Sequence, residues 1–146
     1  MAVINPYIHF NGNAEEAFTF YKSVFGGEFA NVSRYKDISS VEYPIAEDDL
    51  NSIMHIALPI GKSNVLMGSD AMKVMGEVTE KDNRYTVAII AESKTEADKL
   101  YNGLSEGGKI EMTLTDTPMG SYFGMFADKF NVQWMINFDP KFAVQE

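Results

Sequence analysis

The spacing of hydrophobic and polar residues predicts two helices, each of which follows a short extended segment. Apolar residues recur at helical spacing over 14–25 and again over 95–106, and each stretch ends at a Gly-Gly pair. Each stretch also begins at a residue suited to cap a helix, Asn13 or Ser93, with a glutamate three positions later. We therefore expect helices near residues 14–25 and 95–106.

The two predicted helices repeat one pattern. The segment NAEEAFTFY (13–21) recurs as SKTEADKLY (93–101), and Tyr21 and Tyr101 are among the residues that match at an offset of 101 − 21 = 80. Three extended segments follow each helix, near 28–36, 52–60 and 65–69 in the first half and near 109–115, 121–128 and 132–138 in the second. The pattern predicts an α+β fold built from tandem βαβββ modules.

The modules are expected to cover about residues 1–70 and 84–140 of a single domain that spans residues 1–146. Residues 71–83 are rich in Glu, Lys, Asp and Asn and weakly periodic, as is typical of a linker. A helix can cover only one face of each sheet, so the other face needs cover elsewhere. We expect the two uncovered faces to enclose a cleft.

Charge and composition restrict the possible partners. The chain has 12 Lys and Arg against 21 Asp and Glu, a net charge of −9, which disfavours nucleic acid and anionic lipid surfaces. It has no cysteine, which excludes disulfides, thiolate metal sites and thiol nucleophiles. The longest apolar run, Val87 to Ala91, is far shorter than the roughly 20 residues that span a bilayer. We expect a cytoplasmic protein with no membrane or nucleic-acid partner.

Several segments carry a resemblance to a known family. They are NPYIHF (5–10), FY (20–21), MGSD (67–70), GKIEM (108–112) and DKFNVQWMIN (128–137). Together they resemble the PhnB-like branch of the vicinal oxygen chelate superfamily, which includes glyoxalase I, extradiol dioxygenases and bleomycin-resistance proteins. The resemblance implies two βαβββ modules around a U-shaped cavity, often completed in a homodimer. In the metalloenzymes of the superfamily, His, Gln or Glu side chains chelate a divalent ion.

The metal positions implied by the resemblance hold unsuitable residues in this chain. Matching the helices places Pro6 and Thr86 at the first-strand positions, and matching the last strands places Met67 and Met135 at the carboxylate positions. Imidazole or carboxylate donors are needed there, whereas thioethers are soft donors and proline has no side-chain donor. Paired methionines could suit copper(I), although methionine also fills irregular apolar gaps. We expect no glyoxalase-type metal and no cofactor.

Other candidate site residues come from strand alternation. His55 is expected on the cleft side if Met54, Ile56, Leu58 and Ile60 face the helix, whereas Ile53 and Ala57 would share the side of His55. For His9, amphipathicity favours the cleft, but matching the strand to the metal positions favours the opposite face. Each histidine could instead be structural.

The second half offers a similar set of alternating residues. Glu111, Thr113 and Thr115 are expected opposite an apolar face formed by Ile110, Met112 and Leu114, although Glu111 could simply be exposed. In the last strand, Gln133, Met135 and Asn137 alternate with core residues such as Trp134. The candidate ligand-binding residues are therefore His55, Met67, Glu111, Thr113, Gln133, Met135 and Asn137.

The sequence favours a PhnB-like protein that binds a small organic ligand in the cleft without the glyoxalase-type metal. One alternative is a metal-dependent lyase, isomerase or dioxygenase that uses relocated ligands such as His55, Glu111 or His9. Another is a dimeric interaction protein. No catalytic residue is assigned, and whether the chain is an enzyme stays open. In each case a homodimer is expected.

Overall fold

The computed structural model describes residues 2–79 and 84–142, with no side-chain description for residue 142. The first half contains β1 (Tyr7–Phe10), α1 (Ala14–Phe25), β2 (Asn31–Arg34), β3 (Ile53–Ile60) and β4 (Asn64–Asp70). The second half contains β5 (Val87–Ile90), α2 (Lys94–Ser105), β6 (Lys109–Asp116), β7 (Tyr122–Ala127) and β8 (Gln133–Phe138). Both helices begin and end within one residue of their predicted bounds.

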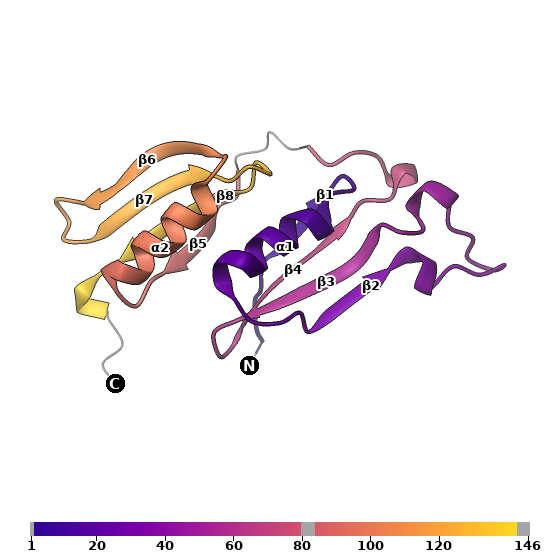
Figure 1. Cartoon of the computed structure of the whole chain (residues 1–146), viewed down its shortest axis with the longest axis horizontal. Helices are drawn as coiled ribbons and strands as arrows, with labels where there is room; N and C mark the ends of the chain where they lie inside the picture. Colours follow the sequence, from indigo (N-terminus) through magenta and orange to yellow (C-terminus); the bar gives the residue numbers. More distant parts are fainter. Residues whose placement is uncertain (1, 80–83, 143–146) are drawn as a thin grey trace. The chain divides into compact units, whose positions relative to one another are not determined.

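Each half forms one four-stranded sheet with the same topology. The strand orders are β1-β4-β3-β2 and β5-β8-β7-β6, and in each sheet the first strand runs parallel to the last strand of its half. The chain divides into two compact units, the first 79 residues and the remainder. The predicted α+β fold of two βαβββ modules is confirmed (Figure 1). The linker prediction falls partly on residues 80–83, which lie outside the described residues.

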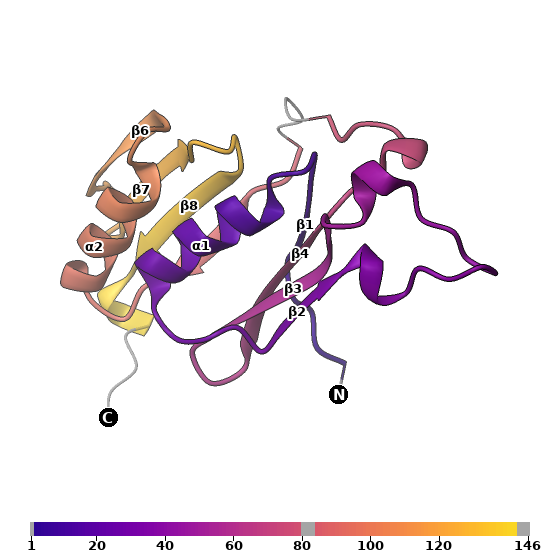
Figure 2. The ribbon, with the colours of Figure 1, turned by 45° about the vertical axis from the view of Figure 1, so that its right-hand side comes forward.

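Helix α1 lies across one face of the first sheet and packs on β3 and β4 (Figure 2). Phe18 and Tyr21 of the helix are fully buried, as are Ile56 and Leu58 of β3. Gly68 in β4 permits this contact, because a Cβ there would lie 2.7 Å from the Phe18 ring. Gly68 therefore marks the side of the sheet that the helix covers.

The beginning of α1 differs from the prediction. The Asn13 side chain makes no capping hydrogen bond; instead the Asp70 carboxylate accepts from the backbone N–H groups of Gly12 and Ala14 through Oδ1, at 3.0 and 2.9 Å. Its Oδ2 accepts from Ile53 N at 2.8 Å. Asp70 is only 2% exposed, so one buried carboxylate joins the helix start to β3 and β4. A local sequence pattern could not reveal a cap that comes from a residue 56 positions away.

Helix α2 begins as predicted at Ser93, whose Oγ accepts from Glu96 N at 3.0 Å. The Glu96 side chain accepts from Glu92 N rather than from Ser93 N, so the predicted reciprocal pair is only half present. Tyr101 of α2 packs edge-on against Phe126 of β7 at 5.5 Å between ring centroids. Tyr101 and Tyr21 occupy the same position in their helices, but Tyr101 is half-buried and Tyr21 is fully buried.

Register shifts change two of the predicted strand faces. Between β2 and β3, Ser33 pairs with His55 but the next residue, Arg34, pairs with Ile53. One extra residue of β3 therefore interrupts the alternation of its faces. Ile53 is consequently buried at 1% exposure, and its predicted place beside His55 on the uncovered face is wrong.

In β6 the predicted apolar face is also wrong. Ile110 pairs with Phe126, which contacts the helix, whereas Met112 pairs with Met125 on the opposite side. Glu111 and Thr113 fall at the two register shifts, and both are exposed. The simple alternation that placed Glu111, Thr113 and Thr115 on one face therefore does not hold.

Candidate functional site

The face of the first sheet opposite α1 brings both histidines together. Ile8 pairs with Gly68, which faces the helix, so the alternating residues Tyr7 and His9 lie on the helix-free face. Ile56 also pairs with Gly68, which places the neighbouring His55 on the helix-free face. The conflict over His9 is thus resolved in favour of the amphipathic pattern.

Aromatic and imidazole rings form a cluster on this face. The Tyr7 ring lies 5.1 Å from the His9 ring and 6.0 Å from the His55 ring, centroid to centroid. Ser69, only 6% exposed, places its Oγ 3.4 Å from His9 Nδ1. We call Tyr7, His9, His55 and Ser69 the histidine cluster.

Hydrogen bonds from β2 orient the His55 ring. Asn31 Nδ2 lies 2.9 Å from Ser33 Oγ and 2.7 Å from His55 Nδ1, and the amide orientation assigned from these two partners makes Asn31 the donor to both. His55 Nδ1 is then an acceptor, so the neutral ring carries its proton on Nε2. The ring is positioned to present an Nε2–H donor.

Charge is distributed unevenly over this unit. The strand residues that share the helix-free face are Tyr7, His9, Asn31, Ser33, His55, Ala57, Pro59, Val65, Met67 and Ser69. None of these described residues is a carboxylate, although the chain as a whole has 21 Asp and Glu. The face therefore offers donors, rings and one thioether, a combination suited to a neutral or anionic ligand.

The helix-free face of the second sheet combines methionines and amides. Phe126 contacts α2 and pairs with Trp134, so the alternating residues Gln133, Met135 and Asn137 lie on the other side, as predicted. Asn137 Oδ1 is buried and has no hydrogen-bond partner among the described residues. Burying an acceptor without a donor costs free energy unless water or a ligand supplies the donor. Of the three side chains, Asn137 is therefore the one that points most directly to a bound group.

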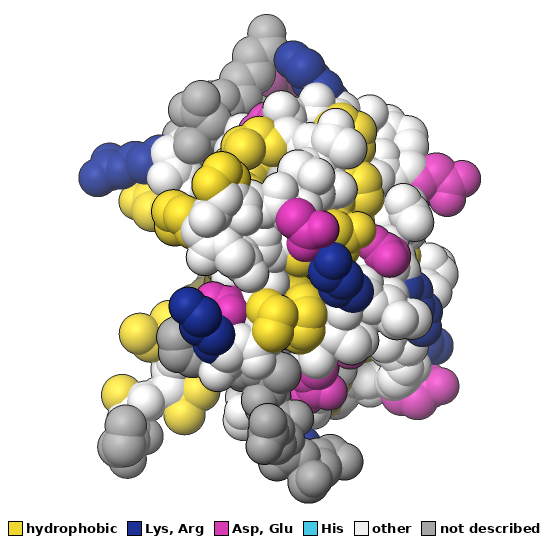
Figure 3. Space-filling model, turned by 90° about the vertical axis from the view of Figure 1, so that its left-hand side faces the viewer, with side chains coloured by type: hydrophobic (Ala, Val, Ile, Leu, Met, Phe, Trp, Pro, Cys, Tyr) yellow, Lys and Arg dark blue, Asp and Glu magenta, His cyan; other side chains and the backbone are white. Residues whose placement is uncertain are grey.

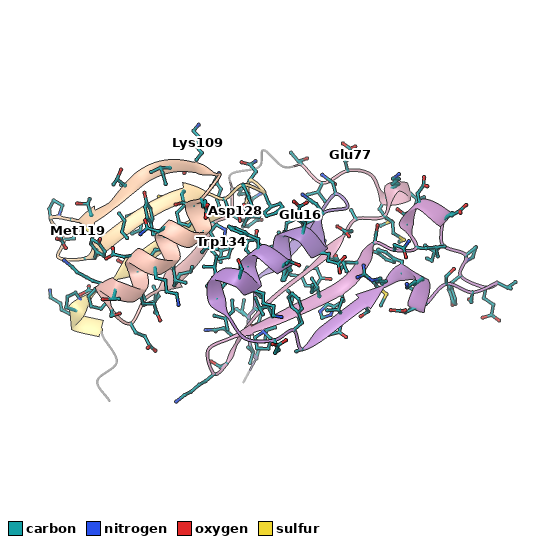
Figure 4. All side chains as sticks on the ribbon, in the orientation of Figure 1. Glu16, Glu77, Lys109, Met119, Asp128 and Trp134 are labelled. Atoms are coloured by element: carbon teal, nitrogen blue, oxygen red, sulfur yellow. The ribbon has the colours of Figure 1, made fainter. Side chains whose placement is uncertain are left out.

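Asp128 has a structural role in the second unit. Its Oδ1 accepts from the backbone N–H groups of Phe130 and Val132, and its Oδ2 accepts from Trp134 Nε1 at 2.9 Å (Figure 4). The carboxylate is 3% exposed and fixes the turn that enters β8. Like Asp70, it belongs to a segment that carried the family resemblance, which shows that those segments include determinants of the fold.

The residues at the superfamily's metal positions do not fit a hard divalent ion. Pro6 has no side-chain donor, and its carbonyl oxygen accepts from Met67 N at 3.1 Å. Met67 pairs with Tyr7 and Ala57, and Met135 pairs with Ala88 and Met125, so neither thioether has a carboxylate or imidazole directly opposite it. Within the two described ranges, no group of three or more His, Asp or Glu side chains is placed to hold a metal ion.

Comparison with known proteins identifies the family. The model of the Glyoxalase/Bleomycin resistance protein/Dioxygenase superfamily matches residues 3–136. The chain belongs to this superfamily. One curated relative is protein YjdN of Escherichia coli (strain K12). It is 28% identical over 137 residues, which cover 92% of this chain and 93% of YjdN.

Solved structures support the same assignment. Protein PA1353 from Pseudomonas aeruginosa is 36% identical, with a TM-score of 0.80 over 95% of this chain and 98% of that one. A Bacillus cereus protein described as a putative 3-demethylubiquinone-9 3-methyltransferase, PhnB protein, is 24% identical, with a TM-score of 0.71 over 94% and 99% of the two chains. This second likeness shows that the superfamily fold is shared.

The sequence analysis missed several residues in and beside the histidine cluster. Tyr7, Asn31 and Ser69 were not among the candidates, because their proximity to the histidines depends on β1 pairing with β4 and β2 with β3. The resemblance of NPYIHF and MGSD to one family was the available signal, since these segments form the neighbouring strands β1 and β4.

Proposed function

We propose that the protein is a PhnB-like member of the superfamily that binds a small organic ligand on the helix-free face of its first sheet, without the glyoxalase-type divalent metal. The histidine cluster is the observation that carries this proposal. It gathers two imidazoles, a phenol and a hydroxyl on a face whose described strand residues include no carboxylate. A few convergent polar groups beside apolar surface are typical of small-molecule sites.

The chemistry of this face narrows the ligand class. Imidazole N–H, phenol and hydroxyl groups donate to oxygen acceptors, so a neutral or anionic oxygen-bearing group suits the first face. A cationic ligand finds no opposite charge among the described strand residues of the first face.

The methyltransferase description of the Bacillus cereus protein is not extended to this chain. A nucleotide-like cofactor is commonly bound by a glycine-rich turn between a strand and a helix, with an acidic residue about 20 positions further on. The turn between β1 and α1 reads NGN, and that between β5 and α2 reads AES, so neither provides such a loop. Ligand sequestration, as in bleomycin-resistance proteins, accounts for the site without a cofactor.

An inventory of the small molecules that co-purify with the chain tests the proposal. Wild-type protein should release one compound in near-stoichiometric amount, detected by mass spectrometry. The double variant His9→Gln with His55→Gln should retain at least about tenfold less, since two lost hydrogen bonds correspond to roughly 1–3 kcal/mol. Lys62→Gln, in the exposed β3–β4 turn, is the control and should retain the wild-type amount. Equal retention in all three proteins would contradict the proposal.

A metal-dependent enzyme with relocated ligands is the second candidate. The observation that favours it is the presence of both histidines on one sheet face, beside Tyr7. Glu111, the third expected ligand, belongs to the other unit. Metal analysis separates this candidate from the first.

A further inference from the structure

The second sheet places three methionines in direct succession across its helix-free face. Met125 of β7 pairs with Met135 of β8 on one side and with Met112 of β6 on the other. Paired residues of antiparallel strands project from the same face, with Cα atoms about 4.5–5.5 Å apart. We call Met112, Met125 and Met135 the methionine row.

The methionine row is not simply core filling within its unit. Met112 is 50% exposed, and Met125 and Met135 are half-buried, whereas Trp134, Phe126 and Ile136 on the opposite face are at most 1% exposed. Apolar side chains that pack a core are normally buried. The methionine row therefore lies, partly exposed, on the face that α2 does not cover.

Three thioethers at directly paired positions on one sheet face offer a donor set for a soft cation. Soft sulfur ligands select copper(I) among the biological metals, whereas carboxylate, carbonyl and imidazole ligands select harder ions. Methionine has three rotatable side-chain bonds, so the two outer thioethers can lean toward the central one across about 5 Å on each side. Residues paired alongside the row include Phe123 with Asn137 and Ala127 with Gln133, none of which is a carboxylate.

We propose that the methionine row binds one monovalent soft cation, copper(I) or its analogue silver(I), through the three thioether sulfurs. Met125 is the central ligand, because it alone pairs with both of the others. The first sheet has no equivalent, since Met67 pairs with Tyr7 and Ala57. The proposal is independent of the proposed ligand function, which rests on the histidine cluster.

The test uses the full chain with ¹³C-methyl-labelled methionine, titrated with silver(I) nitrate in chloride-free buffer. Three of the nine methionine methyl resonances, assigned to the methionine row by substitution, should shift together and saturate at one silver(I) per chain. Zinc(II) should leave these three resonances unmoved. Copper(I), added without oxygen in competition with a coloured chelator, should bind with the same stoichiometry.

Substitutions identify the site. Met125→Leu should weaken silver(I) binding at least about tenfold while leaving the fold intact, because leucine and methionine are similar in volume. Met67→Leu and Met119→Leu are controls and should bind as wild type; Met119 is 84% exposed in the β6–β7 turn, far along the hairpin from Asp128 (Figure 4). Met112→Leu, at the exposed edge strand, repeats the test if Met125→Leu fails to fold.

Three results would overturn the proposal. They are the absence of a shift at tenfold excess silver(I), shifts confined to methionines outside the row, and unchanged affinity in Met125→Leu or Met112→Leu. Binding that survives these substitutions but is lost in His9→Gln with His55→Gln would place the cation at the histidine cluster instead. That result would reject the methionine row without deciding whether the cluster also binds an organic ligand.

Discussion

The Asp70 side chain connects three backbone positions of the first unit. Its carboxylate accepts from Gly12, Ala14 and Ile53, while its backbone oxygen accepts from Tyr35 Oη at 2.8 Å. Asp70→Ala would leave three backbone donors without their acceptor. We expect the free energy of unfolding to fall by roughly 2–4 kcal/mol, measured by urea denaturation.

The control for Asp70 is Asp48→Ala. Asp48 is exposed, and among the described residues it pairs with the exposed Lys73, at 3.4 Å. Surface ion pairs contribute little, so this variant should change stability by less than about 1 kcal/mol. Equal losses of stability in the two variants would contradict the proposed contribution of the Asp70 hydrogen bonds.

Tyr35 should make the protein sensitive to alkali. Burial raises the pKa of Tyr35 above its ordinary value of 10.0, and neighbouring Tyr7, Asp70 and Asp49 raise it further. The folded state thus holds the phenol neutral at a pH where the unfolded chain ionises, so its contribution is present below about pH 10 and is lost as the pH rises further. Tyr35→Phe should remove one late-ionising phenol from an absorbance titration. An unchanged titration curve would contradict the assignment.

At the scale of elements, glycines show how closely strands and helices approach. A Cβ at Gly108, at the end of the α2–β6 turn, would lie 2.1 Å from the Ala127 carbonyl oxygen. Backbone cannot move away as a flexible side chain can, so Gly108→Ala should destabilise the protein by roughly 3 kcal/mol or more in thermal and urea unfolding.

Gly120 provides the matched comparison for Gly108. A Cβ at Gly120 would meet nothing within 4 Å, but its φ of +87° is a conformation that favours glycine. Gly120→Ala should cost only about 1 kcal/mol, the penalty of the backbone conformation alone. If Gly120→Ala were the more damaging of the two, close packing would not be the reason for Gly108.

The elements were largely predictable because their signals are local. Helical periodicity, the Ser93 cap and the offset of 80 positions between Tyr21 and Tyr101 (101 − 21) gave both βαβββ modules. The residues on each face of β3 and β6 were not predictable. Each strand contains a register shift, and where the shift falls depends on the neighbouring strand with which it pairs. The cap from Asp70 escaped prediction for the same reason, because it is contributed by a distant strand.

Some candidate site residues could likewise be placed from local sequence, whereas others required the strand pairing. Gln133, Met135 and Asn137 were placed on the correct face by alternation alone, because β8 is regular. His9 was ambiguous until the pairing of β1 with β4 was known. The methionine row required the pairings of three strands, including one beyond a register shift, so Met112 and Met125 could not be linked to Met135 beforehand.

For the whole molecule, several large apolar side chains are exposed, and the homodimer stays a prediction. Val41 is fully exposed, and Ile4, Val74, Tyr85 and Ile90 are each at least 67% exposed. Figure 3 shows hydrophobic side chains lying among charged ones on one side of the molecule. The exposed apolar side chains are candidates for a protein contact.

Within the described residues, neither helix is long and apolar enough to cross a bilayer.

Light scattering at micromolar concentration tests the assembly. The chain has a mass of 16.3 kDa, and a homodimer should give twice that value. The value should persist at raised salt, since apolar contacts are not screened as charges are. A mass equal to that of one chain would reject the homodimer.

The central claim, that this member of the superfamily works without the glyoxalase-type divalent ion, is tested most directly by metal analysis of protein purified without a chelator or a metal-affinity tag. The residues at the implied metal positions, Pro6, Thr86, Met67 and Met135, predict far less than one equivalent of zinc, nickel, manganese or iron per chain. One equivalent of any of these metals, retained through gel filtration and lost in His9→Ala or His55→Ala, would contradict the account and favour the metal-dependent enzyme.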